Sequence, residues 1–316
     1  MPRKLFFLFC LTIPICLSLL AGQKYLSLNR SGYLPSPLQW LTSHLPTDFE
    51  QIEACYSPDG INFTKKQNVA NYFGEQSGLL LPDGQILLTG LDFHHRQGWL
   101  IDQQTKQAIS DTGFLISKDG WNFERQKLTI SGMNPKFWCW GDPVILQLPN
   151  GHFRMYLTDR TQEAILVSAY SKNGYDYVFE GPVTNEPGVN TDAVDFTPFY
   201  EKKSQQYFIY TRGVDDNHID VLISQDGRHF EQRKTIQPPF TMQISIIDEG
   251  NYYVAYGGHL FTQEPNANLR YPVKAVSTDG LNWTLAEEQP SGPWQGNRTY
   301  CGTYAVIKKN DGYYFY

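Results

Sequence analysis

One acidic residue stands in a setting typical of a sugar-binding site. Asp142 follows Trp138 and Trp140 closely and precedes Pro143. Aromatic rings beside a carboxylate suit a polyol ring, because the rings offer flat apolar faces to its C–H surface. An aspartate before a proline also favours a plain turn at the entry of a strand. We predict a ligand-facing role for Asp142, with the strand-entry turn as its alternative.

Cationic residues supply a second group of candidate ligand contacts. The densest cationic cluster is His-His-Arg at 94–96, from which we take His95 as a contact to a sugar hydroxyl or carboxylate. An ordinary surface histidine is the alternative. Three arginines adjoin segments that we expect to be strands, namely Arg160, Arg212 and Arg298. An anionic substrate group and a salt bridge at the surface are both compatible with them.

The composition excludes several classes of partner and cofactor. The 316 residues contain 26 Lys and Arg against 32 Asp and Glu, without any basic block, which argues against binding to nucleic acid. Beyond residue 22 only Cys55, Cys139 and Cys301 remain, so a disulfide framework is excluded. No cysteine pair has the spacing of metal ligands. We therefore expect neither a metal nor a cofactor.

The first residues have the pattern of a targeting segment. A short basic stretch, Met1–Lys4, precedes an apolar run, Leu5–Gly22. The length of this run fits either a cleaved signal peptide or an uncleaved membrane anchor. We expect a signal peptide or anchor at 1–22, a linker at 23–45 and a folded domain at 46–316. The folded domain is then secreted or extracytoplasmic, and it meets a membrane only if the segment stays uncleaved.

The rest of the chain is organised by a repeat. A serine, an Asp-Gly or Asn-Gly pair and an aromatic residue three positions later recur five times, with glycines 60, 54, 53 and 53 residues apart. These glycines are Gly60, Gly120, Gly174, Gly227 and Gly280. Such pairs between β-rich flanks predict hairpins with two-residue turns, in which both central residues have positive φ. All five turn glycines are expected on one face.

A second hairpin follows most copies of the first, marked by Gly84, Gly151, Gly250 and Gly312. The third copy, around Ser204, has no turn glycine. Each period therefore supplies four strands, which is typical of one blade of a β-propeller. The chain begins with an outer hairpin and ends with an inner one. We therefore predict an all-β, five-bladed propeller closed by pairing of the N- and C-terminal hairpins.

The face opposite the tight turns is expected to carry longer loops, among them 65–76, 92–112 and 128–141. Binding residues concentrate on such loops because a rigid scaffold positions them. We predict the functional site on this face, around the mouth of the central channel.

The predicted architecture, the Gly-Asp-Pro motif at 141–143 and the following stretch 148–156 resemble the five-bladed glycosidases of the arabinanase–fructosidase superfamily. The resemblance covers essentially the whole folded domain. It implies one carboxylate at the start of the inner strand in each of the first three blades. One serves as base or nucleophile, one is an orienting Asp that tunes the pKa of the acid, and one, usually Glu, is the general acid.

Carried over by position, the orienting Asp is Asp142, and the base or nucleophile is Glu75, where the family usually has Asp. The acid is Asp195 or its neighbour Asp192, where the family usually has Glu. Asp192 otherwise serves as a substrate contact. Glu180 resembles the acid-bearing motif of some family members, but it follows an outer strand on the rim, so we reject it.

Two functions stay open on the sequence alone. The first is an exported glycoside hydrolase acting on a glycan or oligosaccharide. The second is a non-catalytic propeller that binds a saccharide or a protein through the same face, because a fold alone licenses no chemistry. A sialidase is disfavoured, since it would need six blades.

Overall fold

The computed structural model describes residues 51–71, 73–92, 112–127, 129–132, 140–159, 165–185, 196–212, 218–260, 270–293 and 305–316. All of these belong to one compact unit, Phe49–Tyr316. The expected targeting segment 1–22 and linker 23–45 lie outside the described residues. The described part of the chain contains no helix that could span a membrane.

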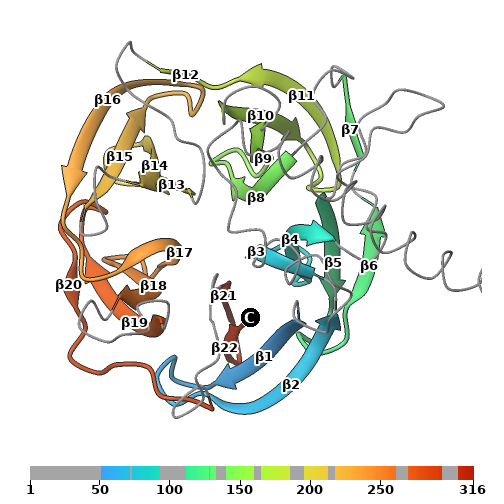
Figure 1. The fold of residues 1–316 in the computed structure, drawn as a ribbon, viewed down its shortest axis with the longest axis vertical. Coiled ribbons are helices and arrows are strands. Elements are labelled where there is room, and N and C mark those ends of the chain that lie inside the picture. The colour runs from blue at the N-terminus through green and yellow to red at the C-terminus, as the bar shows by residue number, and fades with distance from the viewer. Residues whose placement is uncertain are drawn as a thin grey trace, which may run out of the picture. The chain divides into compact units, whose positions relative to one another are not determined.

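The described strands form five sheets arranged as the blades of a ring, each built on four antiparallel strands (Figure 1). From the innermost to the outermost strand, blade 1 contains β3 (Phe73–Leu80), β4 (Ile86–Asp92), β5 (Thr112–Ser117) and β6 (Glu124–Lys127). Blade 2 contains β8 (Trp140–Gln147), β9 (Phe153–Asp159), β10 (Ile165–Ser171) and β11 (Asp176–Pro182). Blade 3 contains β13 (Thr197–Glu201), β14 (Gln206–Arg212), β15 (Ile219–Ser224) and β16 (His229–Ile236).

Blade 4 contains β17 (Thr241–Asp248), β18 (Tyr253–Leu260), β19 (Arg270–Ser277) and β20 (Thr284–Leu285). Blade 5 contains β21 (Val306–Lys309), β22 (Gly312–Phe315), β1 (Gln51–Ser57) and β2 (Thr64–Asn71). Its middle strands come from opposite ends of the chain, and Cys55 pairs with Phe315. The prediction of five blades is confirmed, and the two terminal hairpins share one sheet.

Two short strands extend the outer edges of neighbouring blades. β7 (Thr129–Ser131) lies parallel to β11, and β12 (Thr184–Asn185) lies parallel to β16. Both come from the connection that leads into the blade they extend (Figure 1). They cover part of the outer edge, which would otherwise present unpaired backbone groups.

The hydrophobic core lies between the blades. Five buried clusters each join residues of two adjacent blades, as when Leu87 and Phe114 of blade 1 pack with Phe153 of blade 2. Leu88 points instead to blade 5, because successive residues of a strand face opposite sides. A blade buried on both faces needs continuous apolar runs, which explains the sequence of β4.

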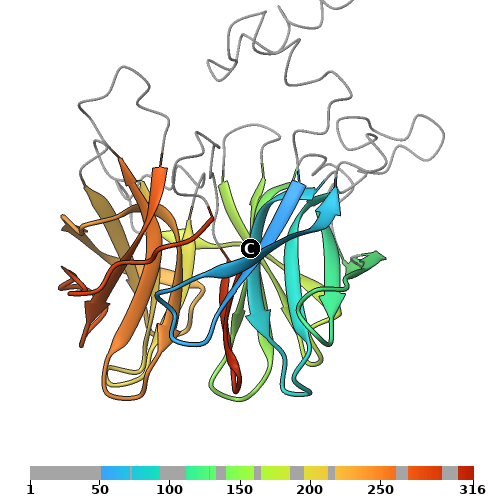
Figure 2. The same ribbon diagram turned by 90° about the horizontal axis from the view of Figure 1, so that it is seen from below.

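The five turn glycines all adopt positive φ, from 70° to 84°. The tight turns between strands lie on one face of the ring, at the lower edge in Figure 2. The expected two-residue turn with two positive φ values is wrong, since the preceding Asp or Asn does not share this conformation. Side chains hold the turn instead. Ser277 Oγ accepts from the N–H of Gly280 at 2.9 Å, and Asp279 Oδ1 accepts from the N–H groups of Leu281 and Asn282.

These hydrogen bonds make the turn sensitive to acid. Burial alone would raise the pKa of Asp279, but the bonds donated by Asn282, Leu281 and Ser277 outweigh it and lower the pKa to about 2. A carboxylate with a lowered pKa stabilises the folded state above its unfolded pKa. That contribution is lost as the pH falls from about 4 to about 2.

We expect Asp279→Asn to lower the free energy of unfolding by about 1–2 kcal/mol at pH 7 and by much less at pH 2. Asn173 occupies the equivalent turn position in blade 2, so an amide fits there. Urea unfolding of both proteins at the two pH values measures the difference. An equal loss at pH 2 and pH 7 would show that the charge of Asp279 is irrelevant.

The third inner turn, which lacks a glycine, is built differently. Gln205 has a φ of 57° and is the one non-glycine residue in the described part of the chain with positive φ. The buried Glu201 carboxylate accepts hydrogen bonds from the Ser204 N–H at 2.6 Å and the Tyr253 hydroxyl at 2.6 Å. These bonds hold the turn in a conformation that a glycine would adopt without strain.

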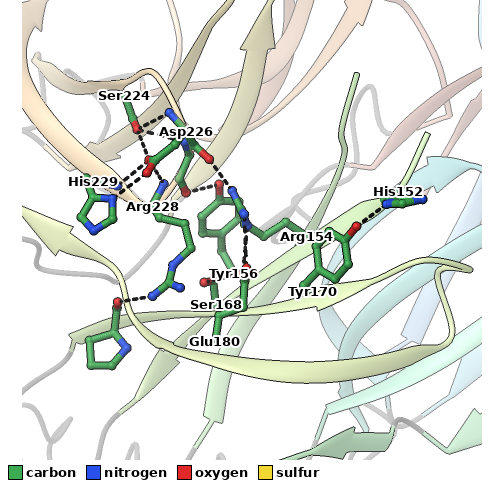
Figure 3. Close-up of polar contacts among 12 residues, drawn as sticks. His152, Arg154, Tyr156, Ser168, Tyr170, Glu180, Ser224, Asp226, Arg228 and His229 are labelled. Atoms are coloured by element: carbon green, nitrogen blue, oxygen red, sulfur yellow. Dashed lines mark hydrogen bonds and ion pairs between the residues drawn. The ribbon is translucent and has the colours of Figure 1, made fainter. Parts of the chain in front are cut away.

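Tyrosine hydroxyls connect four of the five pairs of adjacent blades. Each comes from the second strand of one blade or the residue that follows it, and donates to the carbonyl of the turn glycine in the next blade. The bonds are Tyr156 to Gly227 at 2.8 Å (Figure 3), Tyr210 to Gly280 at 2.6 Å, Tyr256 to Gly60 at 2.8 Å and Tyr316 to Gly120 at 3.0 Å. We call each of these bonds a tyrosine lock.

Replacing Tyr256 by Phe is expected to lower the free energy of unfolding by about 1–3 kcal/mol, because the buried carbonyl of Gly60 loses its partner. Tyr252→Phe is the matched control, since the Tyr252 side chain is 44% exposed. Chemical denaturation of both variants provides the comparison. Equal stability of the two would show that the lock contributes nothing.

Candidate functional site

The innermost strands of the five blades line the middle of the ring, and each contacts the innermost strands of both neighbouring blades. Their first residues lie on the face opposite the tight turns (Figure 2). The strand register gives these strands a common reference position. In each blade it is the residue in or directly before the innermost strand that pairs with the tyrosine of the tyrosine lock. Blade 1 has Thr89 in place of this tyrosine, and its reference residue is the one that pairs with Thr89. These residues are Ser77, Val144, Thr197, Ser245 and Ala305.

Three of the candidate carboxylates stand at the same distance along the sequence from this reference residue. Glu75, Asp142 and Asp195 each precede it by two residues, in blades 1, 2 and 3 respectively. Asp192 precedes it by five residues and does not share this spacing. Both Asp192 and Asp195 lie outside the described residues.

The backbone has the same irregularity at Glu75 and at Asp142. The pairing of β3 with β4 shifts between Gly74 and Ser77, and that of β8 with β9 shifts between Gly141 and Val144. In each bulge two residues oppose one. Bulges are frequent beside active sites because they redirect a side chain. Both candidate carboxylates thus lie in equivalent bulges of adjacent blades.

A hydrogen bond joins the two bulges. Ser77 Oγ donates to the carbonyl of Pro143, the residue after Asp142, at 3.0 Å. Thr197 makes the equivalent contact in blade 3, donating from Oγ1 to the carbonyl of Ile244 at 3.2 Å. The hydroxyl side chains at the reference positions of blades 1 and 3 therefore hold the innermost strand of the next blade in place beside the candidate site.

Glu75 does not lie on a loop, so the expected loop at 65–76 is wrong. β2 continues to Asn71, and β3 begins at Phe73. Phe73 is fully buried in a cluster with Ile52 and Leu88, which makes this segment part of the sheet.

Two other candidates also lie on strands, since Trp140 begins β8 and Arg212 ends β14. The backbone of Glu75, Asp142, Trp140 and Arg212 is described. The remaining candidates, Trp138, Asp192, Asp195, His95, Arg160 and Arg298, lie outside the described residues.

The predicted position of Glu180 on an outer strand is confirmed. Glu180 lies on β11, the outer strand of blade 2, and forms an ion pair with Arg154 at 2.9 Å (Figure 3). Ser168 Oγ donates to the same carboxylate at 2.9 Å. Arg154 also donates to the carbonyl of Asp226 in blade 3 at 2.7 Å. Glu180 thus belongs to a polar network between blades, away from the innermost strands.

The register also identifies a position that sequence reasoning missed. Gln243 precedes the blade 4 reference residue by two positions, and its strand, β17, has an irregular register between Thr241 and Ser245. In the sequence, the blade 5 equivalent is Thr303. The sequence alone could not identify Gln243, because the inner-hairpin turns differ in length between blades and give no common point from which to count.

In the described part of the chain, no group of His, Cys, Asp and Glu is arranged to hold a metal ion.

Comparison with solved structures identifies the fold. The chain is similar to an endo-1,4-β-xylanase from Bacteroides thetaiotaomicron, with 12% identity and a TM-score of 0.52 over 77% of this chain and 83% of the other. It is also similar to an α-L-arabinofuranosidase from Clostridium thermocellum, with 16% identity and a TM-score of 0.52 over 76% and 80%. The chain therefore has the five-bladed fold of family-43 glycoside hydrolases.

A third similar structure is an exo-β-1,3-galactanase from Phanerochaete chrysosporium, with 13% identity and a TM-score of 0.51 over 76% of this chain and 54% of that one. Neither a family model nor a curated protein sequence matches the chain. The resemblance inferred from the repeat and the Gly-Asp-Pro motif is thus confirmed at the level of fold.

Proposed function

We propose that this protein is a glycoside hydrolase that acts on a glycan or oligosaccharide at the face opposite the tight turns. The observation that carries the proposal is the common spacing of Glu75, Asp142 and Asp195, each two residues before the reference residue of its blade, in three consecutive blades. The similar solved structures, a xylanase, an arabinofuranosidase and a galactanase, support a carbohydrate substrate.

In the proposed mechanism the three carboxylates have separate roles. Asp195 donates a proton to the leaving oxygen, and Glu75 acts as base toward water or as nucleophile. Asp142 orients the acid and raises its pKa, because a nearby negative charge disfavours ionisation of a second carboxyl group. The distance between the carboxyl groups of Glu75 and Asp195 decides between inversion and retention.

The lengths of these side chains are exchanged relative to the usual pattern of the superfamily. Glu75 is one methylene longer than Asp, and Asp195 is one methylene shorter than Glu. With a longer side chain on blade 1 and a shorter one on blade 3, the reacting sugar would lie closer to blade 3 than in the usual arrangement. The bulge around Glu75 offers a way to adjust the reach of its side chain.

The remaining candidates are proposed substrate contacts. Trp138 or Trp140 would form one wall of the site by stacking on a sugar ring. Polar contacts to the hydroxyls or an anionic substituent would come from His95, Asp192, Arg160, Arg212 and Arg298. We also propose that the protein is exported through the segment 1–22, which would place the site where extracytoplasmic glycans are available.

Hydrolysis assays of the full chain against a library of glycans and aryl glycosides test this proposal. Release of a reducing sugar that depends on Asp142 supports it. Binding of a glycan without turnover, unchanged in the Asp142→Asn variant, would favour the non-catalytic alternative. Determining the anomer of the first product by NMR then distinguishes inversion from retention.

A further inference from the structure

Among the described residues, the interface between blades 1 and 2 has no tyrosine lock. Thr89 occupies the lock position there, because it pairs with the reference residue Ser77 as Tyr156 pairs with Val144. A threonine hydroxyl ends several ångströms short of the place that a tyrosine hydroxyl reaches. No tyrosine of the described residues donates to the carbonyl of Gly174, the turn glycine of blade 2.

The surroundings of Gly174 differ accordingly. At the other four turn glycines, a tyrosine hydroxyl lies 2.5–3.0 Å from the place where a Cβ atom would stand. At Gly174 the nearest atoms are carbons of Leu81 and Phe153, at 3.4 Å. In place of a tyrosine hydroxyl, the turn at Gly174 meets apolar carbon atoms at a longer distance.

Two hydroxyl groups are left over in the same interface. Thr89 Oγ1 and the Tyr177 hydroxyl are buried, and neither has a hydrogen-bond partner in the part of the chain that the structure describes. Tyr177 stands where the other four repeats have Phe63, Phe123, Phe230 and Trp283, so its hydroxyl is peculiar to this copy. Burial raises the pKa of Tyr177, which keeps the hydroxyl neutral and able to donate.

The two hydroxyls belong to one packed group. Phe114 pairs directly with Thr89 across β4 and β5, so their side chains lie on the same face of blade 1. The Phe114 ring also meets the Tyr177 ring edge to face, with centroids 6.1 Å apart. Thr89 and the Tyr177 ring thus both adjoin Phe114 in the core between blades 1 and 2.

Two unpaired hydroxyls in one core would destabilise the folded state, because each has given up its hydrogen bonds to water without a replacement. A buried water molecule removes this cost when two to four polar groups can reach it. We propose that the interface between blades 1 and 2 is a water-binding site, in which one buried water bridges the Thr89 and Tyr177 hydroxyls and the Gly174 carbonyl. The water takes the place of the missing tyrosine hydroxyl.

The position of this site within the ring gives it importance. Thr89 is paired with Ser77, whose hydroxyl holds the bulge of blade 2 beside Asp142. The interface between blades 1 and 2 is therefore held by the Ser77 hydrogen bond and by the proposed water. Glu75 lies on one side of this interface and Asp142 on the other.

A double-mutant cycle tests the shared water. In the full chain, Thr89→Val and Tyr177→Phe should each lower the Tm by roughly 2–4 °C, because the water loses a partner. The double variant should lose no more than the worse single variant, since the water is already lost in either one. Thr89→Val combined with Tyr210→Phe is the control, and its effects should add because Tyr210 acts in a different interface.

Additive losses in the Thr89–Tyr177 pair would overturn the proposal, as would an increase in Tm for Tyr177→Phe. The increase would mean that the hydroxyl is simply unpaired and that phenylalanine, as in the other repeats, suits the core better. A high-resolution crystal structure gives an independent readout. Electron density for a water within hydrogen-bond distance of both hydroxyls supports the proposal, and its absence contradicts it.

Discussion

Asp142→Asn should reduce the turnover of a glycan substrate by about 100-fold to 10,000-fold, while the Tm changes by no more than about 2 °C. The substitution keeps the shape of the side chain but removes the charge that, in the proposed mechanism, raises the pKa of the acid and stabilises the oxocarbenium-like transition state. The backbone bulge at Asp142 is held by the pairing of β8 with β9 and by Ser77, neither of which depends on this carboxylate.

The measurement is kcat and KM on the best substrate from the library, together with the pH profile of kcat/KM. Loss of the tuning charge should shift the alkaline limb of the profile to lower pH, because the acid would then ionise more easily. Asp83→Asn is the matched control, since Asp83 lies in a tight turn on the opposite face and is exposed. Unchanged turnover in Asp142→Asn would remove this residue from the mechanism, and lost stability would indicate a strand-entry role.

Deleting Gly312–Tyr316 should abolish cooperative unfolding. The deletion removes β22, which joins β21 to β1 within blade 5, and it removes the Tyr316 lock to Gly120 of blade 1. The remaining pieces of blade 5 could not pair in the same way, so two sheet edges and two core clusters would be exposed.

Urea unfolding followed by circular dichroism and by tryptophan fluorescence measures this effect. Tyr316→Phe serves as the control, because it removes one hydrogen bond and leaves the strand in place. The control should unfold in a single transition with a loss of about 1–3 kcal/mol. A single, coincident transition in the truncated protein would show that the ring does not need this strand to fold.

The sequence was sufficient for the architecture because the turn signals are local. A serine, an Asp-Gly or Asn-Gly pair and an aromatic residue specify a hairpin within seven residues, and five near-regular copies specify five blades. The offset between the first and last hairpins predicted that they share a sheet, as Cys55 and Phe315 do. The turn conformation was not predictable, because it depends on where the Ser and Asp oxygens accept hydrogen bonds.

The candidate site was predictable only in part, since its geometry depends on register. The sequence by itself determined the residue types, above all Asp142 before a proline and beside two tryptophans. Only the pairing of the strands decided that Glu75 lies within β3 and which residue of β17 is the reference from which Gln243 is counted as the blade 4 equivalent. Register is set by contacts between distant segments, and a bulge shifts it by one residue without any local signal in the sequence. The missing lock at Thr89 became visible for the same reason, because only the pairing of the strands shows which residue stands where the other four blades have tyrosine.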